Sequence, residues 1–204
     1  MEALPVGALL LDIGGVILTK GWDRHARRAA AERFGYDHDE VEDRHEIVVH
    51  IYEEGDMTLD QYLGHVVFFH ERGFSLDEYK AFMFSQSKPY QDMLQLFAEI
   101  KARYRMKVIA VSNEGRELAV HRIRSFNLDR FIDFFVVSSF VHCRKPDPRM
   151  LQMALDQSLS PADAVIYVDD TPLHVEVARG LGIPAIVHVS QEETAAALRE
   201  IWAR

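Results

Sequence analysis

Short, continuous apolar runs recur along the chain, and most of them end in polar residues. The first run, Ala8–Asp12, closes on a carboxylate that two glycines follow. Four later runs have the same form, at 107–112, 134–138, 164–169 and 185–189. A continuous apolar run that is bounded by turn residues is typical of a buried strand in a parallel sheet. The sequence therefore predicts five such strands.

Helical periodicity separates the later strands. It predicts helices over Glu114–Ser125, Asp147–Leu155, Leu173–Leu181 and Gln191–Ala203. Strands that alternate with helices in this way form a doubly wound parallel sheet with right-handed crossovers. We therefore expect an α/β fold.

The stretch between the first two strands has a different pattern, because no buried-strand run occurs from Trp22 to about Ser87. Helices are predicted instead over 23–34, 38–53, 58–72 and 75–85. Ser75 and Glu78 have the spacing of a capping box. An insert of this length is too long for an ordinary crossover. We expect a small, all-helical cap domain at 19–87, inserted after the first strand into an α/β core at 1–18 and 88–204.

Polar residues follow the predicted strands at one end. They are Asp12, Ser112 with Asn113, Lys145, and Asp169 with Asp170. Ligands of open α/β sheets bind beyond the carboxyl ends of the strands. Clustered carboxylates need a cation to stay ionised together, and their oxygens suit Mg²⁺. A serine hydroxyl, N–H groups at a helix start and a lysine suit a phosphate group. Together these residues indicate phosphoryl transfer through an aspartyl-phosphate.

Composition narrows the possible partners. The 204 residues include 23 Lys and Arg against 32 Asp and Glu, which gives a net charge of −9. This acidic balance argues against a nucleic-acid partner and against a polybasic membrane anchor. The single cysteine, Cys143, excludes an internal disulfide framework and a cysteine-rich zinc module.

The first apolar run does not have the pattern of a targeting segment. No Lys or Arg precedes it, Glu2 does, and Asp12 interrupts it. A signal peptide has a basic start and an uninterrupted apolar stretch, and a membrane-spanning helix needs about 20 apolar residues. We therefore expect a soluble protein with no membrane partner, and the single cysteine favours a reducing, cytoplasmic compartment.

Four motifs occur in an order that resembles a known family. They read LLLDIGGV, VIAVSN, RKPDPRMLQMAL and VIYVDDTPLHVEVARGLGIP. In this order they are similar to the motifs of the haloacid dehalogenase superfamily of phosphohydrolases, in the branch with a helical cap after the first motif. The resemblance implies a Rossmann-like core and a Mg²⁺-dependent phosphatase.

The resemblance also implies roles for individual residues. Asp12 would be the nucleophile, the Ser112 side chain and the Asn113 N–H would hold the phosphoryl group, and Lys145 would balance its charge. The residues implied at the metal are Asp12, the Gly14 carbonyl, Asp170 as a direct ligand and Asp169 through water. Gly14 and Gly15 would lie beside the phosphate.

The chain departs from the family pattern at Gly14. Family phosphatases usually carry a second aspartate there, which acts as general acid and then base. A positioned acid contributes about 10²–10⁴ in rate. Three alternatives follow: a substrate with a good leaving group, an acid from the cap (Asp23, His25 or Lys20), or a non-catalytic module that binds phosphate compounds. Family members whose first motif is similar at this position include phosphatases, which favours an enzyme over a binding module.

The expected activity is Mg²⁺-dependent hydrolysis of a small phosphate monoester, such as a sugar phosphate, by a monomer or homodimer. Dehalogenase chemistry in the same superfamily needs no Mg²⁺ and favours an aromatic residue at the Gly14 position, so the glycine and the Asp169–Asp170 pair count against it. Cys143 and His174 have open roles: Cys143 is expected to be structural, and His174 either supports the loop before it or packs.

Overall fold

The computed structural model describes residues 6–202, which contain one sheet of five parallel strands. The strands are β1 (Ala8–Leu11), β2 (Lys107–Ser112), β3 (Phe134–Val137), β4 (Val165–Asp169) and β5 (Ala185–Val187). Their order is β3-β2-β1-β4-β5. The chain first adds β2 and β3 on one side of β1 and then adds β4 and β5 on the other, so the winding of the sheet reverses between the neighbouring strands β1 and β4. This order confirms the predicted doubly wound sheet. Ligands of such sheets bind beyond the carboxyl ends of the strands at the point of reversal.

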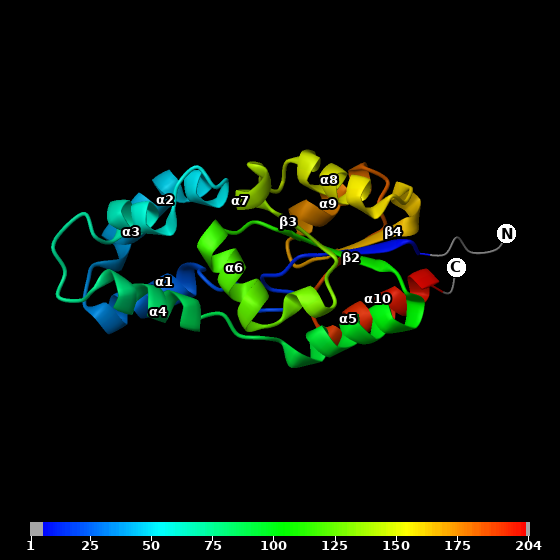
Figure 1. Cartoon of the computed structure of the whole chain (residues 1–204), viewed down its shortest axis with the longest axis horizontal. Helices are drawn as coiled ribbons and strands as arrows, with labels where there is room; N and C mark the ends of the chain where they lie inside the picture. Colours follow the sequence, from blue (N-terminus) through cyan, green and yellow to red (C-terminus); the bar gives the residue numbers. More distant parts are fainter. Residues whose placement is uncertain (1–5, 203–204) are drawn as a thin grey trace.

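Helices cover both faces of the sheet (Figure 1). One face packs against α5 (Gln91–Tyr104) and α10 (Gln191–Trp202), the other against α8 (Pro148–Ser158) and α9 (Pro172–Gly180). Successive strand residues point to opposite faces. Leu9 and Leu11 therefore pack on the α5 side, and Ala8 and Leu10 on the α8 side, all without exposed surface. The sheet is buried on both faces, which explains its unbroken apolar runs.

Four helices between β1 and α5 form a separate lobe at one end of the molecule (Figure 1). They are α1 (Arg24–Phe34), α2 (His38–Glu53), α3 (Leu59–Val66) and α4 (Leu76–Ser85). The lobe has a hydrophobic core of its own, which includes Tyr62, Leu63, Tyr79 and Met83. Leu118 of α6 (Arg116–Ser125) joins this core from the side of the sheet. Helix α6 thus lies between the helical lobe and the sheet.

The chain enters and leaves the helical lobe through two paired segments, residues 18–19 and 86–89. Leu18 forms an antiparallel bridge with Pro89. The Thr19 N–H donates to the Lys88 carbonyl at 2.9 Å, and the Lys88 N–H donates to Thr19 Oγ1 at 3.0 Å. Thr19 Oγ1 in turn donates to the Gln86 carbonyl at 2.9 Å. We call these two paired segments the neck.

Most predicted elements lie within one to three residues of the observed ones, and the observed fold adds α5, the four-residue α7 (Ser138–Val141) and two short turns (Leu128–Arg130 and Ala162–Ala164). Ser75 forms the expected capping box, Thr58 forms another, and Asp23 caps α1 by accepting from the Ala26 N–H. Ala203, the predicted end of the last helix, lies outside the described residues.

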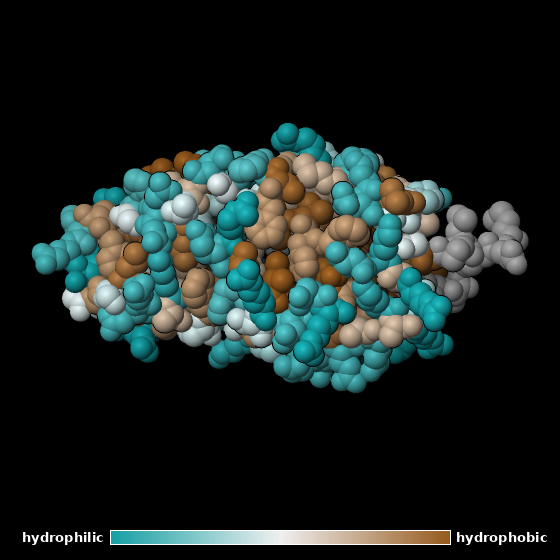
Figure 2. Space-filling model, in the orientation of Figure 1, coloured by the Kyte–Doolittle hydropathy of each residue, from teal (hydrophilic) through white to brown (hydrophobic). Residues whose placement is uncertain are grey.

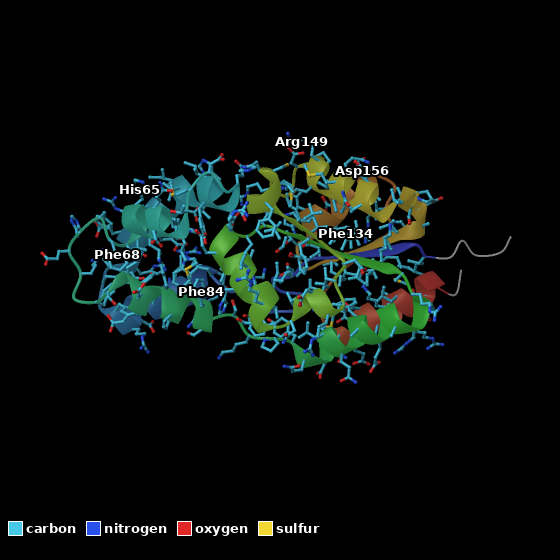
Figure 3. All side chains as sticks on the ribbon, viewed as in Figure 1. His65, Phe68, Phe84, Phe134, Arg149 and Asp156 are labelled. Atoms are coloured by element: carbon cyan, nitrogen blue, oxygen red, sulfur yellow. The ribbon has the colours of Figure 1, made fainter. Side chains whose placement is uncertain are left out.

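The prediction of one helix over 58–72 was wrong, because α3 ends at Val66. The side chain of Arg72 folds back and donates from Nε to the Val67 carbonyl at 2.7 Å, which satisfies a carbonyl that a longer helix would have used. Phe68, half-buried after the helix end, packs on the core of the lobe (Figure 3).

The surface in view is mixed in polarity (Figure 2). Hydrophobic residues gather near the middle of this face, where edge strand β3 carries Phe134 with 40% of its surface exposed (Figures 2 and 3). No helix among residues 6–202 combines the length and apolar character needed to cross a membrane.

Candidate active site

The register of the parallel strands brings three carboxylates together at the point where the strand order reverses. Leu11 pairs with Val168 of β4, so Asp12 and Asp169 leave neighbouring strands at the same level. One carboxylate oxygen from each of Asp12, Asp169 and Asp170 lies within 4.8 Å of the other two. Asp12 is 7% exposed and Asp169 is fully buried. Such a buried cluster needs positive charge nearby.

Lys145 supplies part of this charge. Its Nζ lies 3.1 Å from Asp12 Oδ1 and 2.7 Å from Asp169 Oδ2, and the side chain is buried. Burial alone would lower the pKa of Lys145, but the two carboxylates raise that pKa above its usual value. Lys145 therefore stays an ammonium ion. Burial raises the pKa of Asp12, and Lys145 opposes that rise.

Asp169 already has protein donors on both of its oxygens. Oδ1 accepts from the Thr171 N–H at 2.7 Å, and Oδ2 accepts from Lys145 and from the Tyr167 hydroxyl. His174 Nδ1 lies 3.2 Å from each oxygen. Burial would raise the pKa of Asp169, but these hydrogen bonds hold it well below the usual range. Asp169 is thus a fixed anion that orients its neighbours.

Asp12 and Asp170 keep more freedom to bind a ligand. Asp12 Oδ1 accepts from the Ile13 N–H at 2.7 Å and from Lys145, while Oδ2 has no hydrogen-bond partner among the described residues. Asp170 Oδ2 pairs with Nζ of Lys20 at 2.7 Å, and the Lys20 side chain is 54% exposed. These anionic oxygens, close to one another, fit a hard divalent cation such as Mg²⁺.

Gly15 makes room for Asp170. Its φ of +85° lies in the left-handed region, and a Cβ atom built there would approach Asp170 Oδ2 to 2.3 Å. Glycine is the residue that accepts both the conformation and the contact. Gly14 has no such requirement, because its Cβ position lies 3.6 Å from the nearest atom, an ordinary contact.

The side chain of Asn113 holds the backbone of Lys145 through two hydrogen bonds. Its Nδ2 donates to the Lys145 carbonyl at 2.9 Å, and its Oδ1 accepts from the Lys145 N–H at 2.8 Å. These two bonds fix the loop that carries Lys145 to the end of β2. Ser112, the last residue of β2, is buried next to them.

Three cavities meet at Lys20 on this edge of the sheet, and two of them also meet at Asn113. The smaller of these two, of about 170 Å³, is lined by Asp12, Gly14, Ser112, Lys145 and Asp170 among others, and we call it the sheet-edge pocket. The larger, of about 260 Å³, reaches into the helical lobe, and we call it the cap cavity. Lys20 and Asn113 line both of them, so the two cavities meet at these residues.

The residues proposed as a cap acid lie in different surroundings. Asp23 lines the cap cavity, but its Oδ1 already accepts from the Ala26 N–H at 2.9 Å at the start of α1. His25 is exposed on α1 and lines neither cavity, so the structure does not bring it to the site. The Lys20 ammonium group lies at the site, where it forms an ion pair with the Asp170 carboxylate.

Three residues at the site escaped the sequence analysis. Tyr167 binds Asp169, and its position two residues before Asp169 on the same strand was the signal that places both side chains on one face. Glu114 and Arg122 form a buried ion pair beside Gly14. Glu114 directly follows Ser112 and Asn113, but no local pattern pairs it with Arg122.

Comparisons of the sequence with known proteins identify two relatives. A protein of Caldanaerobacter subterraneus subsp. tengcongensis, provisionally named pyrophosphatase PpaX, is 28% identical over 100 residues, 49% of this chain and 45% of that protein, so the match spans less than half of the relative. The phosphorylated carbohydrates phosphatase of Thermotoga maritima is 26% identical over 192 residues, 89% of this chain and 84% of that protein.

Solved structures show the same fold at low identity. A HAD family enzyme of Bacteroides thetaiotaomicron, crystallised as a magnesium complex, superposes with a TM-score of 0.79 at 18% identity, covering 96% of this chain and 99% of the other. The structure of its complex with magnesium and inorganic phosphate superposes with a TM-score of 0.76 and covers 91% of this chain and 96% of the other. The family model described as haloacid dehalogenase-like hydrolase matches residues 25–188. Since this match spans well over half of the sequence, the chain belongs to the haloacid dehalogenase-like hydrolases.

Proposed function

We propose that this protein is a magnesium-dependent phosphatase that cleaves small phosphate monoesters, such as sugar phosphates, through an aspartyl-phosphate on Asp12. One observation carries the proposal. Asp12 lies in the sheet-edge pocket with Oδ1 held by Lys145 and the Ile13 N–H, while Oδ2 has no protein donor among the described residues. A carboxylate that is fixed through one oxygen and open at the other is arranged as a nucleophile.

The chemistry has two steps at phosphorus. Asp12 Oδ2 attacks the phosphorus atom, and the bond between phosphorus and the ester oxygen breaks. Water then attacks the phosphorus of the phospho-enzyme, which releases phosphate and restores the carboxylate. Ser112, the Asn113 N–H and the backbone at Gly14 and Gly15 are proposed to hold the phosphoryl oxygens, and the Lys145 ammonium is proposed to offset their charge.

Asp12, Asp170 and the Gly14 carbonyl are the proposed direct ligands of Mg²⁺. Asp169 is the proposed outer residue, because both of its oxygens already accept protein hydrogen bonds. When bound, the cation would offset the charge of the carboxylates and of the phosphoryl group. Lys20 forms an ion pair with Asp170, and because its side chain is about half exposed, it is free to move aside for the cation.

The cap cavity is the proposed site of the leaving group. Its volume of about 260 Å³ is below the roughly 300–1,000 Å³ of pockets for drug-sized ligands, which favours a small substrate. The Tyr52 hydroxyl lines it and is buried with no hydrogen-bond partner among the described residues, so a substrate hydroxyl could satisfy it. The Thermotoga relative named for phosphorylated carbohydrates supports a sugar phosphate.

A second candidate function is a non-catalytic module that binds phosphate compounds. Gly14 favours it, because no carboxylate follows Asp12 at the position where family phosphatases usually carry their acid and base. The two candidates share the same pocket and cation, so turnover separates them.

Hydrolysis of p-nitrophenyl phosphate and of a sugar-phosphate panel, with Mg²⁺ and with EDTA, tests the proposal. We expect Mg²⁺-dependent release of phosphate that Asp12→Asn abolishes. Binding of Mg²⁺ and phosphate without turnover of any ester would favour the binding module. Full turnover in Asp12→Asn would refute the assignment of the nucleophile.

Further parts of the proposal concern organisation. We propose that residues 19–87 act as a cap domain on a core formed by 1–18 and 88–204, and that the protein acts as a monomer or homodimer in the cytoplasm. Cys143, which is free and buried, fits a reducing compartment.

A further inference from the structure

The Cβ position of Gly14, where family phosphatases usually carry an aspartate, lies beside a buried arginine. A Cβ atom at Gly14 would lie 3.8 Å from Nη1 and 3.9 Å from Nη2 of Arg122. Arg122 belongs to α6 and is 1% exposed. Its Nη2 donates to the Thr19 carbonyl in the neck. The guanidinium is therefore fixed against the loop that follows Asp12.

Arg122 also forms an ion pair with a carboxyl group. Its Nη1 donates to Oε2 of Glu114, which is 9% exposed. Oε1 of Glu114 has no hydrogen-bond partner among the residues that the structure describes. One oxygen of Glu114 is thus held by the arginine, and the other is available to a ligand.

Glu114 faces the side on which the leaving group is proposed to bind. It lines the cap cavity, and its neighbour Asn113 lines both this cavity and the sheet-edge pocket that contains Asp12. A substrate with its phosphoryl group at Asp12 and its leaving group in the cap cavity would pass Asn113 and meet Glu114.

We propose that Glu114, oriented by Arg122, is the general acid and base that replaces the aspartate absent at Gly14. The assignment rests on the proposed phosphatase function. In the first step the bond between phosphorus and the ester oxygen breaks while Asp12 takes the phosphoryl group, and the Glu114 carboxyl gives its proton to that oxygen. In the second step the Glu114 carboxylate takes a proton from the attacking water, and the bond between phosphorus and Asp12 breaks.

The electrostatic surroundings of Glu114 suit both steps. Burial raises the pKa of its carboxyl to about 7, while the ion pair with Arg122 opposes the rise and the carboxylates of Glu53 and Asp12 add to it. The charged or titratable groups around it are Arg122 from α6, Glu53 and Tyr52 from α2, and Asp12 after β1. An acid and base works best when its pKa lies near the working pH.

The test compares two leaving groups, because a good leaving group departs without a proton and an alkoxide does not. For Glu114→Gln we expect kcat/KM on a sugar phosphate to fall by about 10²–10⁴ and kcat/KM on p-nitrophenyl phosphate to fall far less. The phospho-enzyme should accumulate, seen as a burst of nitrophenolate, because the base of the second step is lost. Glu42→Gln is the matched control: this carboxylate is also buried against an arginine, Arg27, and lines neither cavity.

Gly14→Asp provides a rescue. The backbone of Gly14 is outside the left-handed region, and the nearest atom to its Cβ position is an ordinary contact at 3.6 Å, so a Cβ atom fits there and an added carboxylate would start beside Arg122. The double variant Gly14→Asp/Glu114→Gln should recover part of the lost kcat/KM on the sugar phosphate. In the unmodified protein, kcat/KM on the sugar phosphate should fall as pH rises through about 7, and kcat/KM on p-nitrophenyl phosphate should lack this fall.

An equal loss on both substrates in Glu114→Gln, or no loss on either, would overturn the assignment of Glu114. So would identical pH profiles for the two substrates in the unmodified protein, a measurement that does not depend on any variant folding. Absence of turnover in the unmodified protein on every ester would overturn the proposed function and this assignment with it. Turnover that needs Asp12 but not Glu114 would overturn the assignment alone.

Discussion

Alanine is expected to be tolerated at Gly14 and damaging at Gly15, although the two residues are adjacent. A Cβ atom at Gly14 meets its nearest neighbour at 3.6 Å. At Gly15 the Cβ atom meets Asp170 Oδ2 at 2.3 Å, and the φ of +85° is strained for a residue with a side chain. Gly15→Ala therefore combines backbone strain with displacement of a proposed metal ligand.

The two effects can be separated in magnitude. Left-handed backbone costs about 1–2 kcal/mol for a residue with Cβ. Gly35, the C-cap of α1, has a φ of +70° and no atom within 4 Å of its Cβ position, so Gly35→Ala measures this strain alone. Ordinary contact begins at 3.4 Å, so Asp170 must retreat by about 1 Å in Gly15→Ala. A displacement of about 1 Å at a reacting centre can cost about 10²-fold in rate.

The assay is kcat/KM on p-nitrophenyl phosphate over a range of Mg²⁺ concentrations, together with urea denaturation. Gly15→Ala should lose about 10²-fold in kcat/KM and need more Mg²⁺ for half-maximal activity. Gly35→Ala should lose only about 1–2 kcal/mol of unfolding free energy. Gly14→Ala should keep most of its activity. Equal kcat/KM in Gly15→Ala and Gly35→Ala would refute the role of the contact with Asp170.

Three more substitutions probe other contacts. Lys145→Met, which removes the ammonium between Asp12 and Asp169, should lower kcat/KM by about 10²–10³-fold, and unchanged steady-state kinetics would contradict this role. Tyr167→Phe should lower the urea-measured unfolding free energy by about 1.5–3 kcal/mol, because the lost hydrogen bond ends on a buried carboxylate; a loss near zero would contradict this. Burial lowers the pKa of His45 to about 4, so the unfolded state, with a pKa of about 6.5, binds the proton first and stability falls with pH below about 6.5. Between pH 7 and pH 5 the unfolding free energy of His45→Gln should therefore fall by about 2 kcal/mol less than that of the unmodified protein. Parallel curves of unfolding free energy against pH would contradict the lowered pKa of His45.

The sheet was predictable because its strands are buried on both faces. Leu9, Leu10 and Leu11 have no exposed surface, and this double burial produces the unbroken apolar run that marks a strand. Asp12 and Asp169 end such runs, so the parallel register brings them together without any further information.

Helix α5 was missed although its buried residues Met93, Phe97 and Ile100 recur at helical spacing. Its start lacks a side-chain cap, but so do the starts of the predicted helices α6 and α9. The pairing of Arg122 with Glu114 and with the Thr19 carbonyl was out of reach of any local pattern. Arg122 and Thr19 are 103 residues apart, and only the packing of α6 against the neck brings them together.

The neck has a consequence for how the helical lobe can be lost, gained or exchanged. Thr19 and Lys88 are 69 residues apart in sequence but are joined by one backbone hydrogen bond and by a second from the Lys88 N–H to the Thr19 hydroxyl, so the two ends of the insert already have the spacing of a hairpin. A turn of about four residues could bridge them, and each halving of a loop changes its closure entropy by only about 0.6 kcal/mol, or about 2.5 kcal/mol over four halvings. Loop closure therefore sets only a small cost on removing the lobe, and the larger cost is the exposure of Leu118, which packs in the core of the lobe. Within one sheet framework, the lobe residues that line the proposed leaving-group site can be replaced as a block while Asp12, Lys145 and Asp169 keep their places.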